Sequence, residues 1–170
     1  MKTEIGEYIV GAYLKLIKQC SVVDYNVRRP GGGLAGLEEI DVIGLDFKNE
    51  TAYLCEVTTH LDGLLYGSSN ADTIKRIQRK YLNMQNYAKD YLTDFLNYHK
   101  FMFWSPVVTP ATRIALEEME GLELIINDIY ADSVEQLREF AKKHTYDTGN
   151  PAMRVLQILG HLRKEKSIRK

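Results

Sequence analysis

Two neighbouring segments rich in β-branched and aromatic residues constrain the fold of this chain most. They span residues 37–47 and 51–59, and a polar turn around Lys48 and Asn49 separates them. Residues of these types favour strands, and two such runs joined by a short polar turn are typical of a β-hairpin. The sequence therefore predicts an antiparallel pair of strands here, which argues against an all-α fold.

The register of this hairpin predicts a pair of carboxylates. A turn centred on Lys48-Asn49 places Asp41 opposite Glu56, whereas a three-residue loop would break that register. Like charges directly opposite each other are destabilising, and a divalent cation bound between them is the usual remedy. The alternative is that both residues are simply solvated near the strand ends.

The remaining segments predict helices and further strands on both sides of the hairpin. Apolar spacing, capping residues and prolines place them as follows: helices over 3–19, 70–97 (capped by Asn70 or Asp72), 111–120, 132–143 (capped by Asp132 or Ser133) and from Pro151 onward; strands over 22–27, 100–108 and 122–127; and a mobile loop over 28–33. Strands joined through helices pair in parallel. The order predicts an α/β fold with a central mixed sheet flanked by helices.

Size and composition indicate one ordinary globular domain. The chain has 170 residues, 22 Lys and Arg, and 23 Asp and Glu, so its net charge of −1 neither favours nor excludes DNA as a partner. Two cysteines, Cys20 and Cys55, are too few for a disulfide framework. Glu4 and Glu7 lie where a signal peptide would be apolar, and no apolar run is long enough to span a membrane. We therefore expect a cytoplasmic protein with no membrane partner.

Several short motifs resemble those of one nuclease superfamily. They are Gly6-Glu7 in the first helix, Glu-Ile-Asp-Val-Ile-Gly over 39–44, Leu-Cys-Glu-Val-Thr over 54–58, and the long helix with Lys and Arg that follows. In this order they resemble the PD-(D/E)XK superfamily, nearest its Mrr and archaeal Holliday-junction-resolvase branches. The resemblance covers about residues 3–108. It implies a restriction-endonuclease-like αβββαβ core there, with 109–170 as a C-terminal αβαα extension of a single domain.

The resemblance also implies an activity and its residues. It predicts a metal-dependent DNA endonuclease that uses Mg²⁺ or Mn²⁺, held by Asp41 and Glu56, with Glu7 assisting. Hard carboxylate oxygens suit these ions better than zinc. The superfamily has a catalytic Lys two residues after the Glu, but this chain has Thr58 there. Threonine supplies no positive charge and exchanges no proton near neutral pH.

A lysine on the long helix is the candidate replacement for the missing one. Some members of the superfamily carry their Lys on that helix, where this chain has Arg76, Arg79 and Lys80. Lys80 lies nearest the apolar stripe, so we expect it to point inward and to act in catalysis. The alternative is a solvated helix face.

Arginines beside the predicted site are candidates for contacts with nucleic acid. Arg28 and Arg29 precede three glycines in the loop, and with Arg76 and Arg79 they are expected to hold backbone phosphates without reading sequence. Two alternative functions stay open at this point. One is a catalytically inactive nucleic-acid-binding member of the same fold, and the other is a protein-interaction or assembly module. Whether two copies pair as a homodimer to cut both strands is also open.

Overall fold

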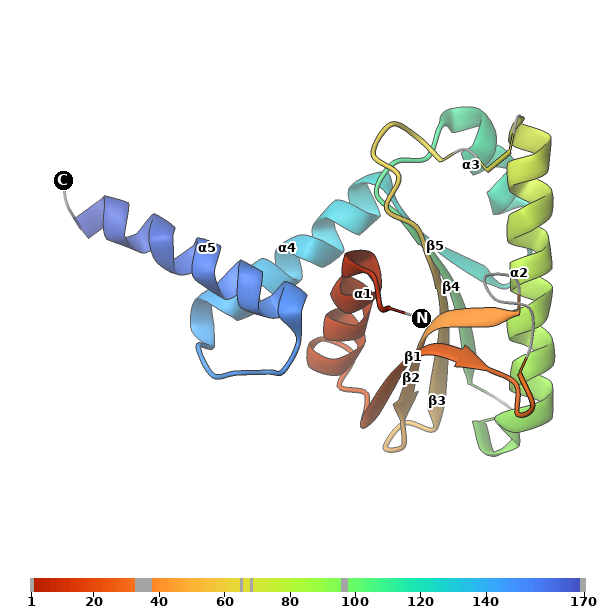
Figure 1. Ribbon diagram of the computed structural model, residues 1–170, viewed down its shortest axis with the longest axis horizontal. Coiled ribbons are helices and arrows are strands. Elements are labelled where there is room, and N and C mark those ends of the chain that lie inside the picture. Colours follow the sequence, from red (N-terminus) through yellow and green to blue (C-terminus); the bar gives the residue numbers. More distant parts are fainter. Residues whose placement is uncertain (1, 33–37, 65, 68, 96–97, 169–170) are drawn as a thin grey trace.

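A central sheet with helices on both faces forms the body of the protein (Figure 1). The structure is a computed structural model that describes residues 2–32, 38–64, 66–67, 69–95 and 98–168, with only the backbone described over 163–168. Among these residues no helix is long and apolar enough to cross a membrane.

The observed elements follow the predicted order. They are α1 (Ile5–Leu16), β1 (Val22–Arg28), β2 (Glu39–Asp46), β3 (Thr51–Val57), α2 (Asn70–Tyr91), a 3₁₀ turn (Thr93–Phe95), β4 (His99–Ser105), α3 (Pro110–Glu117), β5 (Leu122–Ile126), α4 (Asn127–Lys143) and α5 (Pro151–Ile168). Pro151 opens the last helix, as expected of a residue with a fixed φ and no N–H.

The five strands pair in sequence order, β1-β2-β3-β4-β5. β1, β2 and β3 form antiparallel pairs, whereas β3, β4 and β5 run parallel to one another. Each parallel connection passes through a helix, which a crossover between parallel strands requires. The α/β class, the mixed sheet and the flanking helices are therefore confirmed.

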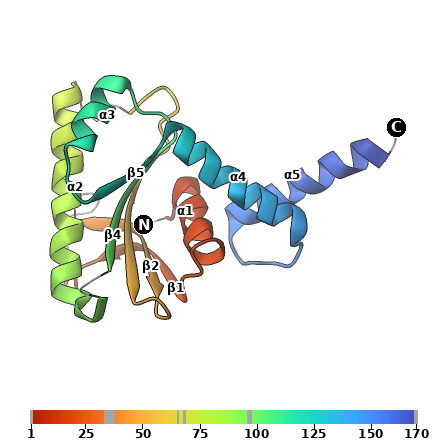
Figure 2. The ribbon, with the colours of Figure 1, turned by 180° about the vertical axis from the view of Figure 1, so that it is seen from behind.

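The two faces of the sheet carry separate apolar cores. α2 and α3 cover one face, and α1, α4 and α5 lie on the other side (Figures 1 and 2). Side chains of β3 alternate between the two, so that Leu54 packs in the α2 core and Cys55 in the α1 core. The same alternation returns Glu56 to the face covered by α2.

Two predicted helix starts were wrong. Ser69 caps α2, because its Oγ accepts a hydrogen bond from the Asp72 N–H at 3.2 Å, so neither Asn70 nor Asp72 is the cap. α4 begins at Asn127 directly after β5, five residues before the predicted cap at Asp132. The Asn127 side chain is bonded to the Val108 backbone through both its oxygen and its nitrogen, which fixes this start by a tertiary contact.

The predicted end of the long helix and the glycine loop are only partly described. α2 ends at Tyr91, while Asn97, the predicted end, lies outside the described residues. Gly31 and Gly32 adopt φ values of 89° and 91°, a region that glycine enters without strain. Gly33 and the rest of 33–37, including the predicted strand start at residue 37, lie outside the described residues.

α1 approaches β1 closely at Gly11. A Cβ atom added at Gly11 would lie 2.0 Å from Tyr25 Oη and 2.6 Å from two ring carbons. Only a residue without a side chain allows the helix and the tyrosine ring to pack at this separation. Gly160 in α5 is different, since an added Cβ would meet Lys142 Cγ at 3.7 Å, an ordinary contact.

Alanine should therefore have opposite effects at the two helical glycines. Gly11→Ala is expected to lower the free energy of unfolding by about 1–3 kcal/mol, because overpacking outweighs the helix propensity that is gained. Gly160→Ala is the matched control and is expected to leave it unchanged or raise it by up to about 1 kcal/mol. Urea denaturation measures both, and equal effects at the two positions would contradict the close packing of α1 on Tyr25.

Candidate functional site

The hairpin has the predicted register. Val42 pairs with Cys55 and Ile43 with Leu54, as a turn centred on Lys48-Asn49 requires. Beyond Val42 the hydrogen bond between the two strands is made by a side chain. The Asp41 Oδ2 accepts it from the Val57 N–H at 2.7 Å. Asp41 is thereby fixed at the end of β2 beside Glu56.

Lys80 lies between the two predicted carboxylates. Its Nζ is 2.8 Å from each of Glu56 Oε1 and Oε2, and 3.5 Å from Asp41 Oδ1. Lys80 is 6% exposed, Glu56 is 4% exposed and Asp41 is 8% exposed. Asp41, Glu56 and Lys80 therefore form one buried charged cluster, which we call the carboxylate–lysine cluster.

The inward direction of Lys80 follows from its place on α2. Ile77 and Met84 are buried one turn before and one turn after it, so all three share the face that packs on the sheet. Arg76 and Arg79 are exposed. The prediction that Lys80 alone of the three points inward is confirmed.

Burial and mutual repulsion disfavour the charged forms of both carboxylates. Burial raises the pKa of Glu56 well above its ordinary value, and the neighbouring Asp41 charge raises it further, while Lys80 opposes both. Burial likewise raises the pKa of Asp41, although the Lys80 ammonium and the Val57 N–H counteract it. Burial lowers the pKa of Lys80, but the two carboxylates outweigh this effect and raise it.

Two further residues lie beside the cluster. Thr58 is buried, and its side chain contacts Tyr66, which lowers the pKa of that tyrosine. Tyr66, which the sequence analysis missed, has its pKa raised by burial and also by the charge of Glu56. The ring of His60 lies 5.5 Å from that of Tyr66. No spacing rule identifies Tyr66, because it comes from the loop before α2.

Glu7 lies near the cluster but has its own partners. Its Oε2 accepts the Glu4 N–H at 3.0 Å and the Asn26 Nδ2–H at 3.1 Å. The first of these bonds satisfies a free N–H at the start of α1, which is a structural role. Burial raises the pKa of Glu7, and the charge of Asp41 also raises it. Asn26 is a second contact that the sequence analysis missed.

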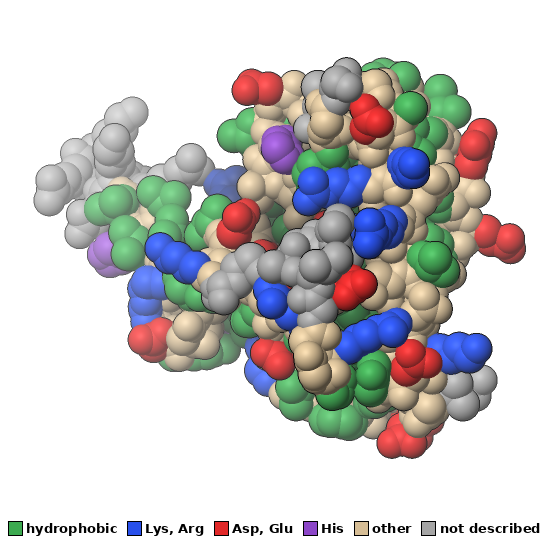
Figure 3. Space-filling view, turned by 45° about the vertical axis from the view of Figure 1, so that its right-hand side comes forward, with side chains coloured by type: hydrophobic (Ala, Val, Ile, Leu, Met, Phe, Trp, Pro, Cys, Tyr) green, Lys and Arg blue, Asp and Glu red, His purple; other side chains and the backbone are tan. Residues whose placement is uncertain are grey.

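The four predicted phosphate-binding arginines have different surroundings. Arg28 Nε donates to the buried Glu39 Oε2 at 2.7 Å, and Arg29 lies 3.7 Å from Asp90. The guanidinium of Arg76 stacks over the Tyr66 ring, 4.4 Å from its centre. Arg79 is exposed and lines a shallow pocket together with Arg29. Lys and Arg side chains are prominent on the face that Figure 3 turns forward.

The carboxylate–lysine cluster has a donor set that fits Mg²⁺ or Mn²⁺. Asp41 and Glu56 supply hard carboxylate oxygens, and the buried Thr58 hydroxyl two residues after Glu56 is a further oxygen. The two carboxylates and one ammonium leave a net charge of −1 when all are ionised. The described residues contain no group of three or more His, Cys, Asp or Glu placed to hold a metal. Water would therefore complete the shell, as is common for Mg²⁺.

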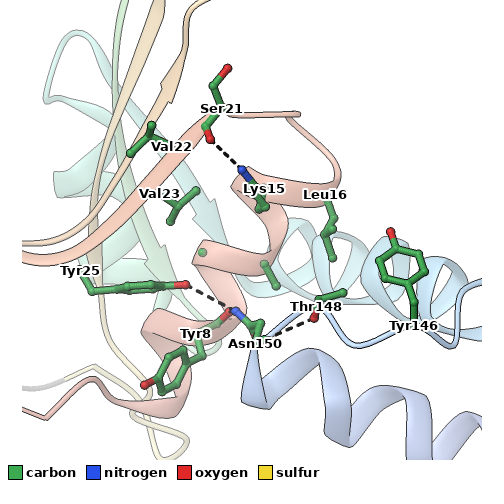
Figure 4. A pocket seen from close by; sticks show the side chains of 13 residues that line it. Tyr8, Lys15, Leu16, Ser21, Val22, Val23, Tyr25, Tyr146, Thr148 and Asn150 are labelled. Atoms are coloured by element: carbon green, nitrogen blue, oxygen red, sulfur yellow. Dashed lines mark hydrogen bonds between the residues drawn. The ribbon is translucent and has the colours of Figure 1, made fainter.

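A separate pocket lies on the other side of the sheet. It has a volume of about 600 Å³ and is lined by α1, the start of β1 and residues 146–150. Figure 4 shows Asn150 at its centre, with Nδ2 bonded to the Tyr8 carbonyl and to Tyr25 Oη. None of Asp41, Glu56 and Lys80 lines this pocket. The chemistry-bearing residues therefore lie elsewhere.

The raised pKa of Glu56 predicts how stability depends on pH without metal. Because the pKa of Glu56 is raised in the folded state, folding favours the protonated form of this carboxyl. The stability that this preference adds is present below the ordinary glutamate pKa of 4.5 and is lost as the pH rises above it. In EDTA, Glu56→Gln should therefore gain melting temperature relative to wild type as the pH rises above 4.5.

The matched control is Glu118→Gln, on an exposed glutamate after α3. Its melting temperature should stay at a constant offset from wild type over the same pH range. A constant offset for Glu56→Gln as well would mean that the ionised carboxylate is fully compensated by Lys80.

Comparison with known proteins adds no identity to this geometry. No family model matches the chain, and searches of curated proteins and of solved structures also give no match. Inference about function therefore starts from the carboxylate–lysine cluster.

Proposed function

We propose that this protein is a metal-dependent nuclease of the PD-(D/E)XK type that hydrolyses phosphodiester bonds in DNA. The observation that carries the proposal is the position of Lys80, whose Nζ lies within 3.5 Å of both predicted metal-ligating carboxylates. The chain has Thr58 where the resemblance predicts a lysine, and α2 brings an ammonium group to the same carboxylates. A positive charge at this place can stabilise the negative charge that builds up on the phosphate during hydrolysis.

The residues of the chain divide the work between them. Hydrolysis forms a bond between phosphorus and a water oxygen and breaks a bond between phosphorus and a sugar oxygen. The attacking water loses a proton to solvent, and the departing sugar oxygen takes one up to become a hydroxyl. The Lys80 ammonium is placed to stabilise negative charge on the phosphate. Asp41 is held by the Val57 N–H, so its second oxygen stays aimed at Lys80.

Asp41 and Glu56 would hold the metal ion, and Thr58 would offer a further oxygen. When bound, Mg²⁺ or Mn²⁺ lowers the pKa of a water molecule and neutralises charge on the phosphate. A divalent cation also compensates the repulsion between the two carboxylates, which share a single ammonium among the described contacts. Glu7 would assist only indirectly, because its Oε2 is engaged by the Glu4 N–H and by the Asn26 side chain.

Arginines near the α2 face support DNA as the substrate. Arg79 and Arg76 are exposed on α2, and Arg29 lies across from Arg79 in the same shallow pocket. Such charges bind phosphates without reading sequence. Arg28 contributes less, because its guanidinium is engaged by Glu39.

A non-catalytic nucleic-acid-binding protein of the same fold is the second candidate. It is favoured by the contact of Lys80 with both oxygens of Glu56, an arrangement that already neutralises one carboxylate without metal. In that case the cluster would be a structural ion pair. Metal binding and cleavage distinguish the two functions.

Metal binding should depend on the two buried carboxylates. Calorimetry with Mn²⁺ is expected to show binding by wild type and its loss in Asp41→Asn and Glu56→Gln, because each change removes a charged ligand. The control is Asp62→Asn, an exposed acid in the loop after β3, which should bind as wild type does. Unchanged binding in Asp41→Asn would exclude the cluster as the metal site.

Cleavage should depend on Lys80 far more than on its neighbour. Lys80→Met is expected to lower the Mg²⁺-dependent cleavage rate of duplex or single-stranded DNA by about 10²–10³-fold, the usual effect of losing one charge-stabilising donor. The matched control Arg79→Met, on the exposed side of α2, should lose much less. Far-UV circular dichroism checks that both variants are folded. Equal small losses of cleavage rate in the two variants would mean that Lys80 has a structural role only.

A further inference from the structure

Arg76 is a cation on the surface of α2 that no carboxylate engages. Its side chain is exposed, and it forms no ion pair within the part of the chain that the structure describes. Arg28, by contrast, is held by Glu39. An arginine without an acid partner keeps its charge and its N–H donors for an anion from outside the protein.

The ring of Tyr66 supports this free guanidinium. The Arg76 Cζ atom lies over the ring, 4.4 Å from its centre. The attraction between a guanidinium and a ring comes from the positive charge, and it uses none of the five N–H donors for a hydrogen bond to oxygen. Arg76 is therefore held in place while its donors remain available.

Tyr66 is itself fixed by contacts with its neighbours. Its N–H donates to Thr73 Oγ1 at 2.8 Å, and its carbonyl accepts a hydrogen bond from the same hydroxyl at 3.2 Å. Thr73 is fully buried on α2, so these two bonds tie Tyr66 to the helix that carries Arg76. The ring of His60 meets the Tyr66 ring edge-on. The support under the guanidinium is thus anchored on both sides.

Tyr66 also lies beside the carboxylate–lysine cluster. Burial and the charge of Glu56 raise the pKa of its hydroxyl, while contact with Thr58 and the charge of Lys80 lower it. Arg76 and Lys80 are four residues apart on α2, a spacing at which side chains are neighbours on a helix. Tyr66 therefore connects the exposed guanidinium with the buried cluster.

We propose that Tyr66 is a positioning residue, which holds the Arg76 guanidinium ready for a backbone phosphate of DNA bound at the carboxylate–lysine cluster. This role rests on the proposed nuclease function, because that function supplies the anionic strand. A long arginine side chain loses rotamer freedom when it binds a ligand, and ordering it beforehand reduces this cost.

Arg79 provides the comparison that isolates the contribution of the ring. It is exposed on the same helix, and among the described residues it has no ion pair and lies over no aromatic ring. Any contact that Arg79 makes with DNA is therefore made without support from Tyr66.

A double-mutant cycle in DNA binding tests the positioning role. Fluorescence anisotropy with labelled duplex and single-stranded DNA in EDTA measures the Kd without metal-dependent cleavage. Tyr66→Leu is expected to raise the Kd about 2–5-fold, because one exposed cation–π contact is lost. Arg76→Met is expected to raise it about 10-fold, the effect of losing one charge-assisted hydrogen bond. In the Arg76→Met background Tyr66→Leu should cause no further loss.

The matched cycle combines Tyr66→Leu with Arg79→Met, and there the two losses should multiply. Losses that multiply in both cycles would overturn the positioning role, and Mg²⁺-dependent cleavage by the same wild type would leave the nuclease function standing. A coupled Tyr66–Arg76 cycle in a protein that cleaves no DNA would overturn the nuclease and retain the positioning role in DNA binding. A wild type that binds no DNA would overturn both.

A second comparison does not depend on the folding of Tyr66→Leu. Tyr66→Phe keeps the ring, so it should retain most of the affinity that Tyr66→Leu loses. Arg76→Lys keeps the charge at an exposed position but removes the planar group with its forked donors, and it should weaken binding more than Arg79→Lys does. Circular dichroism and melting check that each variant is folded. Equal losses in the two lysine variants would contradict a special placement of Arg76.

Discussion

The buried ion pair between Lys80 and the two carboxylates is the interaction on which the rest of the structure depends. Removing three charged groups from water is costly, and attraction between them repays that cost only when the geometry is good and hydrogen bonds are satisfied. Here both oxygens of Glu56 contact the Lys80 ammonium. Asp41 forms an ion pair with the same ammonium and accepts a hydrogen bond from the Val57 N–H. Loss of one partner from such a cluster commonly costs about 3–5 kcal/mol, a large part of the stability of a small domain.

The same cluster explains why acids can sit at the centre of the sheet. Glu56 is on the central strand β3, flanked by β2 and β4. Alternation along β3 turns it toward α2, and the spacing of α2 turns Lys80 toward it. Sheet and helix therefore meet through a charge contact embedded in apolar packing, with Ile77 and Met84 on either side of Lys80.

Local patterns in the sequence were enough to predict that Lys80 points toward the sheet that carries Asp41 and Glu56. The Lys48-Asn49 turn fixed the hairpin register, and the apolar stripe of α2 fixed the direction of Lys80. The sequence-based expectation that a metal must compensate the carboxylates missed that Lys80 already compensates them in part. Contacts between distant segments were beyond these rules. The bond of Glu7 to Asn26, the approach of Tyr66 and the start of α4 at Asn127 each depend on where another loop or strand lies.

The chain order of the cluster also has a kinetic consequence. Asp41 and Glu56 belong to one hairpin with a short turn, whose contacts are local and form on the microsecond timescale. Lys80 is 24 residues further along the chain, and its bond to Glu56 forms only when α2 docks on the sheet. A folding chain therefore carries two uncompensated acids until the helix arrives. Docking of α2 brings the compensating charge as well as apolar surface, so the speed of this step should depend on pH and on salt.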